Sequence, residues 1–106
     1  MTLTSDTAKA FKTLFCEYKS LRKKGFTKED SRKFTRASIY EIPAFSDWLH
    51  PDIDCALDEL RKSGCIKCDI TGKITISDEG IKYMEAQPKE FFKELSHLFD
   101  LASLFV

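Results

Sequence analysis

Residues 52–84 constrain the fold of this chain more than any other stretch. Apolar residues recur at helical spacing over 52–63, and Gly64 then supplies the left-handed residue that ends many helices. β-Branched residues alternate with polar ones over 65–70 and 73–76, which predicts two strands joined by a tight turn. A serine after the second strand is a suitable N-cap for a further helix. The residues expected in the core of this stretch are Ile53, Ala56, Leu57, Leu60, Ile66, Ile70, Ile74, Ile76, Ile81 and Met84.

The first half of the chain predicts further helices. Apolar residues three and four apart predict a helix over 5–24. Residues 27–30 resemble a capping box and begin a helix expected to end near Phe34 or the residue after it. Because Pro43 interrupts any longer helix, we expect a helical turn at 37–42 followed by an irregular segment. The core residues expected here are Ala8, Phe11, Leu14, Phe15, Tyr18, Leu21, Ile39, Ile42, Phe45, Trp48 and Leu49.

Residues 88–106 predict a last helix that begins at Pro88 and carries a wide apolar stripe. The stripe either packs across the first helix of its own domain or forms a homodimer interface. We favour the homodimer, because monomers rarely expose a large apolar patch. The chain then consists of a domain over 1–87 and a packing or dimerisation element over 88–106. The residues assigned to this element are Phe91, Phe92, Leu95, Leu98 and Phe99.

The length and the amino-acid composition of the chain are typical of one globular domain. The chain has 106 residues, of which 42% are hydrophobic and nine are Phe, so it has enough apolar material for a core. No apolar run reaches the ~20 residues that a membrane span requires, and no signal-peptide pattern is visible. We therefore expect a cytoplasmic protein whose four cysteines are reduced thiols.

The charge is unevenly distributed although the net charge is zero. Residues 9–36 hold ten Lys and Arg against three acids, a net charge of +7, whereas residues 41–106 have a net charge of −6. A segment of such positive charge favours an anionic partner.

The stretch LDELRKSGCIKCDITGKITISDEGIKYM (residues 57–84) resembles the winged helix-turn-helix superfamily. The resemblance lies in Leu60 to Gly64 at a helix end, in Ile66 opening a strand, and in ISDEG (76–80) opening the next helix. The wider chain is similar to small phage- or prophage-associated bacterial proteins of unassigned function. The resemblance implies a mainly α fold of the α+β class, with a two-stranded β-hairpin wing and an extra C-terminal helix. It also implies association with nucleic acid.

Two features depart from that pattern. The wing is short, and its basic residues are Lys67 and Lys73. The helix over 52–63, which would enter the DNA groove, carries four acids against two bases and would be repelled by phosphates. We interpret its acids either as an ordinary solvated face or as a surface that docks a basic protein partner. The residues assigned to the protein-docking alternative are Asp54, Asp58 and Glu59.

The basic segment is the stronger candidate for contact with nucleic acid. Its cations would grip phosphates without reading sequence if they share one face. A solvated basic face, or one that meets the acidic half of a second copy, remains an alternative. Phe26 and Phe34 are interpreted as core anchors, with base stacking as the alternative. The assigned residues are Lys12, Lys19, Arg22, Lys23, Lys24, Lys28, Arg32, Lys33 and Arg36, assisted by Lys67 and Lys73.

Catalytic and metal-binding patterns are weak. Cys65 and Cys68 have the spacing of half a zinc site, but neighbouring strand positions point to opposite faces, so we expect free thiols and no metal. His50 and Cys55 lack the partners of a nucleophilic pair, and the chain has neither a P-loop nor a GxGxxG motif. We expect no enzyme activity and no cofactor.

Overall fold

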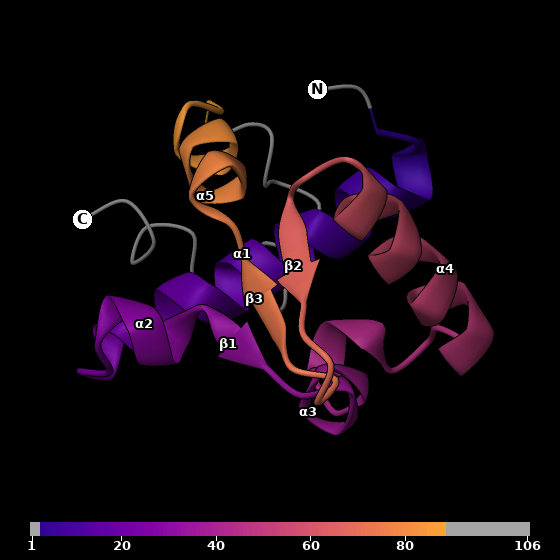
Figure 1. Cartoon of the computed structure of the whole chain (residues 1–106), viewed down its shortest axis with the longest axis horizontal. Helices are drawn as coiled ribbons and strands as arrows, with labels where there is room; N and C mark the ends of the chain where they lie inside the picture. The colour runs from indigo at the N-terminus through magenta and orange to yellow at the C-terminus, as the bar shows by residue number, and fades with distance from the viewer. Residues whose placement is uncertain (1–2, 89–106) are drawn as a thin grey trace.

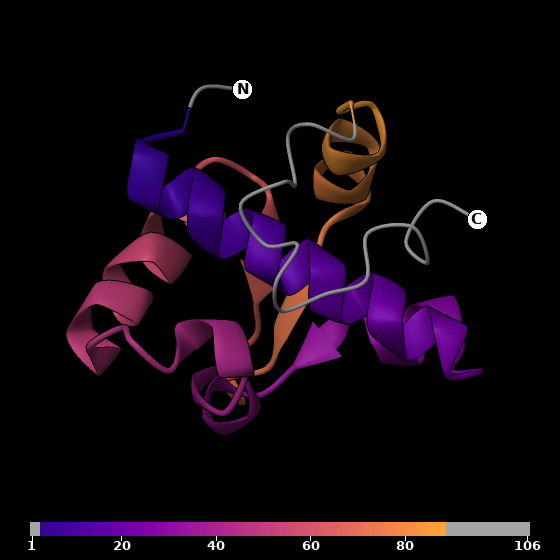
Figure 2. The same ribbon diagram turned by 180° about the vertical axis from the view of Figure 1, so that it is seen from behind.

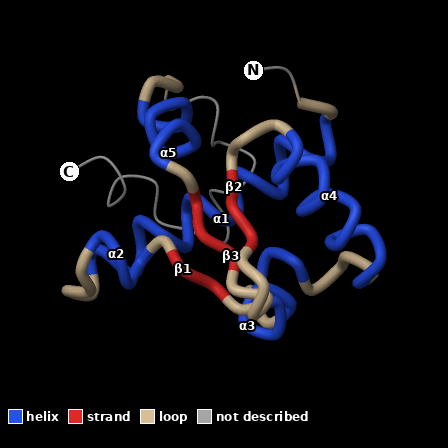
Figure 3. The backbone as a smooth tube through the Cα atoms, in the orientation of Figure 1, coloured by secondary structure: helices blue, strands red, loops and turns tan. Residues whose placement is uncertain are grey.

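The computed structural model describes residues 3–88 as a mainly helical α+β fold around a small three-stranded antiparallel sheet. Figure 1 shows its elements in space, and Figure 3 colours them by type. In chain order they are α1 (Ser5–Lys23), α2 (Lys28–Ser31), β1 (Lys33–Phe34), α3 (Arg36–Tyr40), the 3-10 turn η1 (Pro43–Phe45), α4 (His50–Lys62), β2 (Ile66–Cys68), β3 (Ile74–Ile76) and α5 (Asp78–Glu85).

Helix α1 spans the molecule and packs against one face of the sheet, as the view from behind in Figure 2 shows. Thr4 caps it, because its side-chain oxygen accepts the backbone N–H of Thr7 at 3.4 Å. Phe11, Leu14 and Phe15 of this helix are buried in the core. The predicted helix over 5–24 is therefore confirmed to within a residue at its end.

The sheet has the strand order β1-β3-β2. Lys33 and Phe34, which form strand β1, were expected to end a helix, and this expectation is wrong. Helix α2 ends at Ser31, because the next residues pair with β3: Phe34 lies opposite Ile74, and the Ile76 N–H donates to the Arg32 carbonyl at 3.0 Å. Ladder hydrogen bonds and the burial of Phe34 thus replace one more turn of helix.

Helices α3 and α4 follow the first strand. Thr35 and Ser38 form a reciprocal capping box at the start of α3, where a helical turn was expected. Pro43 opens η1, which needs no N–H at that position. Helix α4 begins at His50, two residues before the expected start, with Pro51 in its first turn.

Strands β2 and β3 pair antiparallel but are shorter than expected. The turn between them folds around Asp69, whose carboxylate accepts the backbone N–H groups of Thr71 and Lys73, each at 2.9 Å. Gly72 adopts a φ of +87°, which side chains rarely tolerate. This turn withdraws Ile70 from the ladder, so that its side chain lies in solvent.

The prediction of core burial is wrong for three residues. Phe26, Leu49 and Ile70 are exposed by 50%, 70% and 105%. Each lies in a connection beside a helix or strand end, where the chain turns away from the core. The other predicted core residues are buried, apart from Ala8, Leu21 and Trp48, which are half-buried.

The predicted C-terminal helix and its stripe lie outside the described residues, apart from Pro88. Within residues 3–88, no helix has the length and apolarity to cross a bilayer.

Candidate nucleic-acid interface

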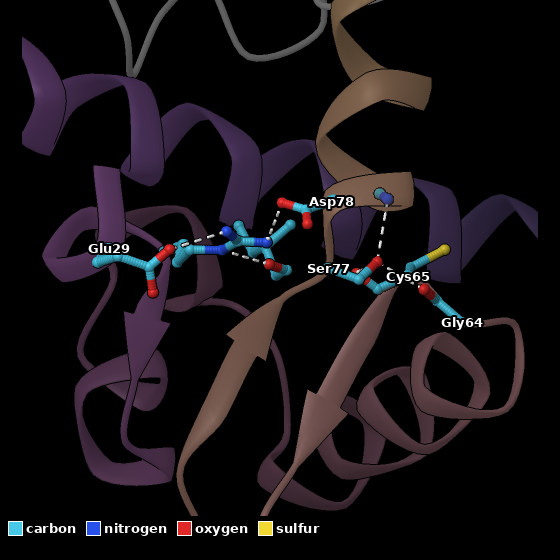
Figure 4. A network of polar contacts seen from close by, with 8 residues as sticks. Glu29, Gly64, Cys65, Ser77 and Asp78 are labelled. Atoms are coloured by element: carbon cyan, nitrogen blue, oxygen red, sulfur yellow. Dashed lines mark hydrogen bonds and ion pairs between the residues drawn. The ribbon is translucent and has the colours of Figure 1, made fainter. Parts of the chain in front are cut away.

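Arg32 is the one residue of the assigned basic set that the fold buries. Its side chain is surrounded by acceptors: Nε donates to the Ile76 carbonyl at 2.8 Å, and the guanidinium pairs with Glu29 at 3.1 Å and Asp78 at 2.8 Å. Figure 4 shows Glu29 and Asp78 at this network. The guanidinium lowers the pKa of the Asp78 carboxyl below its usual value. Arg32 therefore ties α2 to the start of α5 and is not available to phosphate.

Three other cations of the set are already engaged at the surface. Lys19 pairs with Glu85 at 3.4 Å and lies over the Phe15 ring. Arg22 donates to the Phe26 carbonyl at 3.2 Å. Arg36 pairs with an acid of α4, described below. Of the remaining two residues on α1, Lys12 is half-buried and Lys23 is exposed.

Five exposed lysines of the assigned set form no ion pair within residues 3–88, and we call them the basic surface: Lys24, Lys28, Lys33, Lys67 and Lys73. They come from the end of α1, from α2 and from all three strands or their turn. The register brings two of them together, because Lys33 of β1 and Lys67 of β2 both lie opposite Thr75 of β3. Residues directly opposite in a sheet share a face, so these two lysines flank Thr75 on one side of the sheet.

The first predicted docking acid of α4, Asp54, is held by two neighbours. It accepts the Tyr40 hydroxyl at 2.6 Å and pairs with Arg36 at 2.5 Å. The Tyr40 hydrogen bond, followed by the one from Arg36, lowers the pKa of the Asp54 carboxyl. The His50 ring stacks on Tyr40 with centroids 3.9 Å apart.

The other two docking acids are also satisfied within the chain. Asp58 pairs with Arg61 at 2.8 Å and Lys62 at 3.0 Å, and these contacts lower the pKa of its carboxyl. Glu59 accepts hydrogen bonds from the hydroxyl groups of Thr7 and Thr4 of the α1 start. The carboxylates of α4 that were expected to meet a partner therefore have internal partners.

An acidic cavity lies between the starts of α1 and α4. Its volume is about 450 Å³, within the range of small-molecule sites. Sequence reasoning missed it, because its carboxylates are far apart in the chain and only the packing of the two helices brings them together. The lining residues are Thr4, Asp6, Thr7, Lys9, Asp47, Trp48, Asp52, Cys55, Ala56 and Glu59.

The cysteines are free thiols in two different environments. Cys16 and Cys65 are buried, and burial raises the pKa of Cys16 to about 12 and the pKa of Cys65 to about 11. Cys55 and Cys68 are exposed. Cys65 and Cys68 thus lie in different surroundings, and no group of three or more metal-ligating side chains gathers within the part of the chain described here.

No family model, no curated protein and no solved structure matches this chain.

Proposed function

We propose that this chain is a small non-enzymatic winged-helix protein that associates with nucleic acid through phosphate contacts. The observation that carries the proposal is the basic surface. Lysines from two separate stretches of the sequence are exposed without an ion pair in the described region, and two of them lie in one row across the sheet. Such a group attracts a polyanion and gains free energy by releasing its counterions.

The order of the elements supports the winged-helix interpretation. Two helices, α3 and α4, precede an antiparallel β2–β3 pair, and the short strand β1 joins that pair on the β3 side. Lys67 and Lys73 lie on this pair and its turn, at the place of a wing. Figure 1 shows the turn extending away from α5 and towards α3.

The test is a titration of labelled random-sequence duplex DNA, followed by fluorescence anisotropy at low and then near-physiological salt. We expect binding whose affinity falls steeply with salt, at about 0.9 logarithmic units per phosphate contact for each tenfold rise in salt. Absence of binding at the lowest salt would contradict the proposed function.

A protein partner is the second candidate function, and the acidic cavity favours it. Asp6, Asp47 and Asp52 have no ion pair within residues 3–88, and the half-buried Trp48 ring lies beside them. A Lys or Arg side chain of a partner fits such surroundings. Titration with a labelled Arg-rich peptide tests this candidate, and Asp47→Asn with Asp52→Asn is expected to weaken binding.

Homodimer formation through residues 88–106 and a cytoplasmic location remain parts of the proposal. The free thiols of the described cysteines fit a reducing compartment.

A further inference from the structure

We propose that the open face of the sheet is the contact surface for nucleic acid, and that its ligand is the phosphate backbone of duplex DNA, bound without reading of the bases. This inference rests on the proposed function and assigns it a surface that differs from the outer side of α4. Helix α1 packs on the opposite side of the sheet, as Figures 1 and 2 show together.

The sheet register places the charges. Lys33, Thr75 and Lys67 form one row across β1, β3 and β2, with the two lysines exposed. With neighbouring strands about 4.8 Å apart, the lysine Cα atoms are about 10 Å from each other. Their long side chains therefore reach separate phosphates, with a hydroxyl between them as an additional donor.

Two acids near this row share one buried cation. Glu29 and Asp78 both pair with the buried Arg32, whose single positive charge compensates one of their two negative charges. The positive charges of Lys28 and Lys67 also lower the pKa of the Asp78 carboxyl. Lys28, Lys33 and Lys67, together with Arg32, therefore outnumber these two acids, and the excess of positive charge attracts a polyanion.

The composition of this face favours a duplex over a single strand. Proteins that bind single strands stack bases on aromatic side chains. The row itself has no aromatic residue, and Phe34 of β1 is buried on the other side. A duplex requires no stacking, because it presents its phosphates outside and its bases inside.

The outer side of α4 is a poor reader of bases. Its cations Arg61 and Lys62 are both held by Asp58, and Arg36 beside it is held by Asp54. A base contact would have to break these pairs and would leave two carboxylates near phosphates. The two lysines of the sheet row form no ion pair within residues 3–88, whereas these three cations at α4 do.

Two matched variants separate these surfaces. Lys33→Gln with Lys67→Gln removes two positive charges from the sheet face, and Arg61→Gln with Lys62→Gln removes two from α4. All four side chains are exposed, so both variants are expected to fold, which circular dichroism and a thermal melt would verify. Each is titrated with the same labelled duplex over a series of salt concentrations, and the wild type is also titrated with a second duplex of unrelated sequence.

The sheet-face variant is expected to bind at least about tenfold more weakly at low salt, with a salt slope reduced by about 1.8 for two lost contacts. The α4 variant is expected to stay within about twofold of the wild-type affinity, because the cations of α4 contact no phosphate. The two duplexes are expected to bind the wild type equally.

Equal losses of affinity in both variants, or a loss confined to the α4 variant, would overturn the sheet-face proposal while leaving nucleic-acid binding intact. A strong preference for one duplex would overturn the proposal that the protein binds the phosphate backbone without reading the bases. Failure of the wild type to bind would instead reject the proposed function itself.

Discussion

At the scale of single residues, Arg32 shows how the fold changes the role of a side chain. It belongs to the most basic segment of the sequence, yet only 8% of it is exposed. Its Nε is the side-chain donor to the Ile76 carbonyl, and its terminal nitrogens join α2 to α5. A buried cation with this many partners specifies an arrangement of elements, because losing it leaves a carbonyl without its donor.

Replacement of Arg32 by Met is therefore expected to lower the free energy of unfolding by about 1–3 kcal/mol, since the Ile76 carbonyl loses a buried hydrogen bond. Urea denaturation measures this change. Arg61→Met is the control, because Arg61 forms only an exposed pair with Asp58 and should cost less than about 1 kcal/mol. Equal costs in the two variants would show that Arg32 contributes no more than a surface pair.

The Arg32–Asp78 pair also predicts a pH dependence. Arg32 lowers the pKa of Asp78 in the folded protein, so the pair stabilises the fold fully above the unfolded pKa of about 4. This contribution is lost as the pH falls through the lowered folded pKa, where the carboxyl is protonated. Asp78→Asn is expected to lower the urea midpoint at pH 7 and to change it much less at pH 2. A difference that persists at pH 2 would exclude the ion pair as its cause.

The cysteines are expected to react in two classes. At pH 8 a thiol reagent such as Ellman's should modify Cys55 and Cys68 rapidly, because both are exposed. Cys16 and Cys65 should react only after unfolding, since burial raises the pKa of Cys16 to about 12 and that of Cys65 to about 11. Rapid reaction of all four thiols in the native protein would mean that the core opens on the timescale of the assay.

At the scale of elements, the attachment of α5 depends on a close approach at Gly80. A Cβ atom there would lie 2.5 Å from the Cys65 carbonyl oxygen and 2.9 Å from Cζ of Phe11. The carbonyl belongs to the backbone and cannot move aside without shifting the entry to β2. Gly80 thus allows α5 to lie against both α1 and the sheet.

Gly80→Ala is accordingly expected to destabilise the protein by about 1–3 kcal/mol, although alanine favours helices. A thermal melt measures the effect, with Lys82→Ala on the exposed side of α5 as a control expected to change stability by less than about 0.5 kcal/mol. A stabilised Gly80→Ala variant would contradict the close packing.

Helices α1 and α4 and the β2–β3 pair were predictable as elements, because local periodicity specifies them. Strand β1 was not. Its two residues follow a good helix start, and only the hydrogen bonds to β3 draw them out of helical conformation. The predicted burial of Ile70 was wrong for a similar reason. The turn at Asp69 ends the strand, although β-branched residues alternate with polar ones as far as Ile70.

At the scale of the whole molecule, the charges separate onto different faces. The basic surface lies around the sheet and α2, whereas four carboxylates and one lysine, Lys9, line the cavity between α1 and α4. This separation of charge favours two kinds of partner at different places: the basic surface attracts a polyanion, and the cavity attracts a cationic side chain.

The oligomeric state is a further prediction at this scale. The apolar stripe predicted over 88–106 favours a homodimer, so light scattering of the full chain is expected to give about twice the monomer mass of 12.2 kDa. Truncation after Gln87 should return the particle to a monomer. A monomeric full chain would contradict the dimer.

The sequence by itself determined the class of the fold and the order of most elements, because the spacing of apolar residues is a local property that survives without tertiary contacts. It also revealed the uneven charge. Only the tertiary structure decided which charges remain available: it buried Arg32, paired Asp54 with Arg36, and placed Lys33 in one row with Lys67. These outcomes depend on strand register and helix packing, which join residues that are distant in the chain and leave no periodic signal within it.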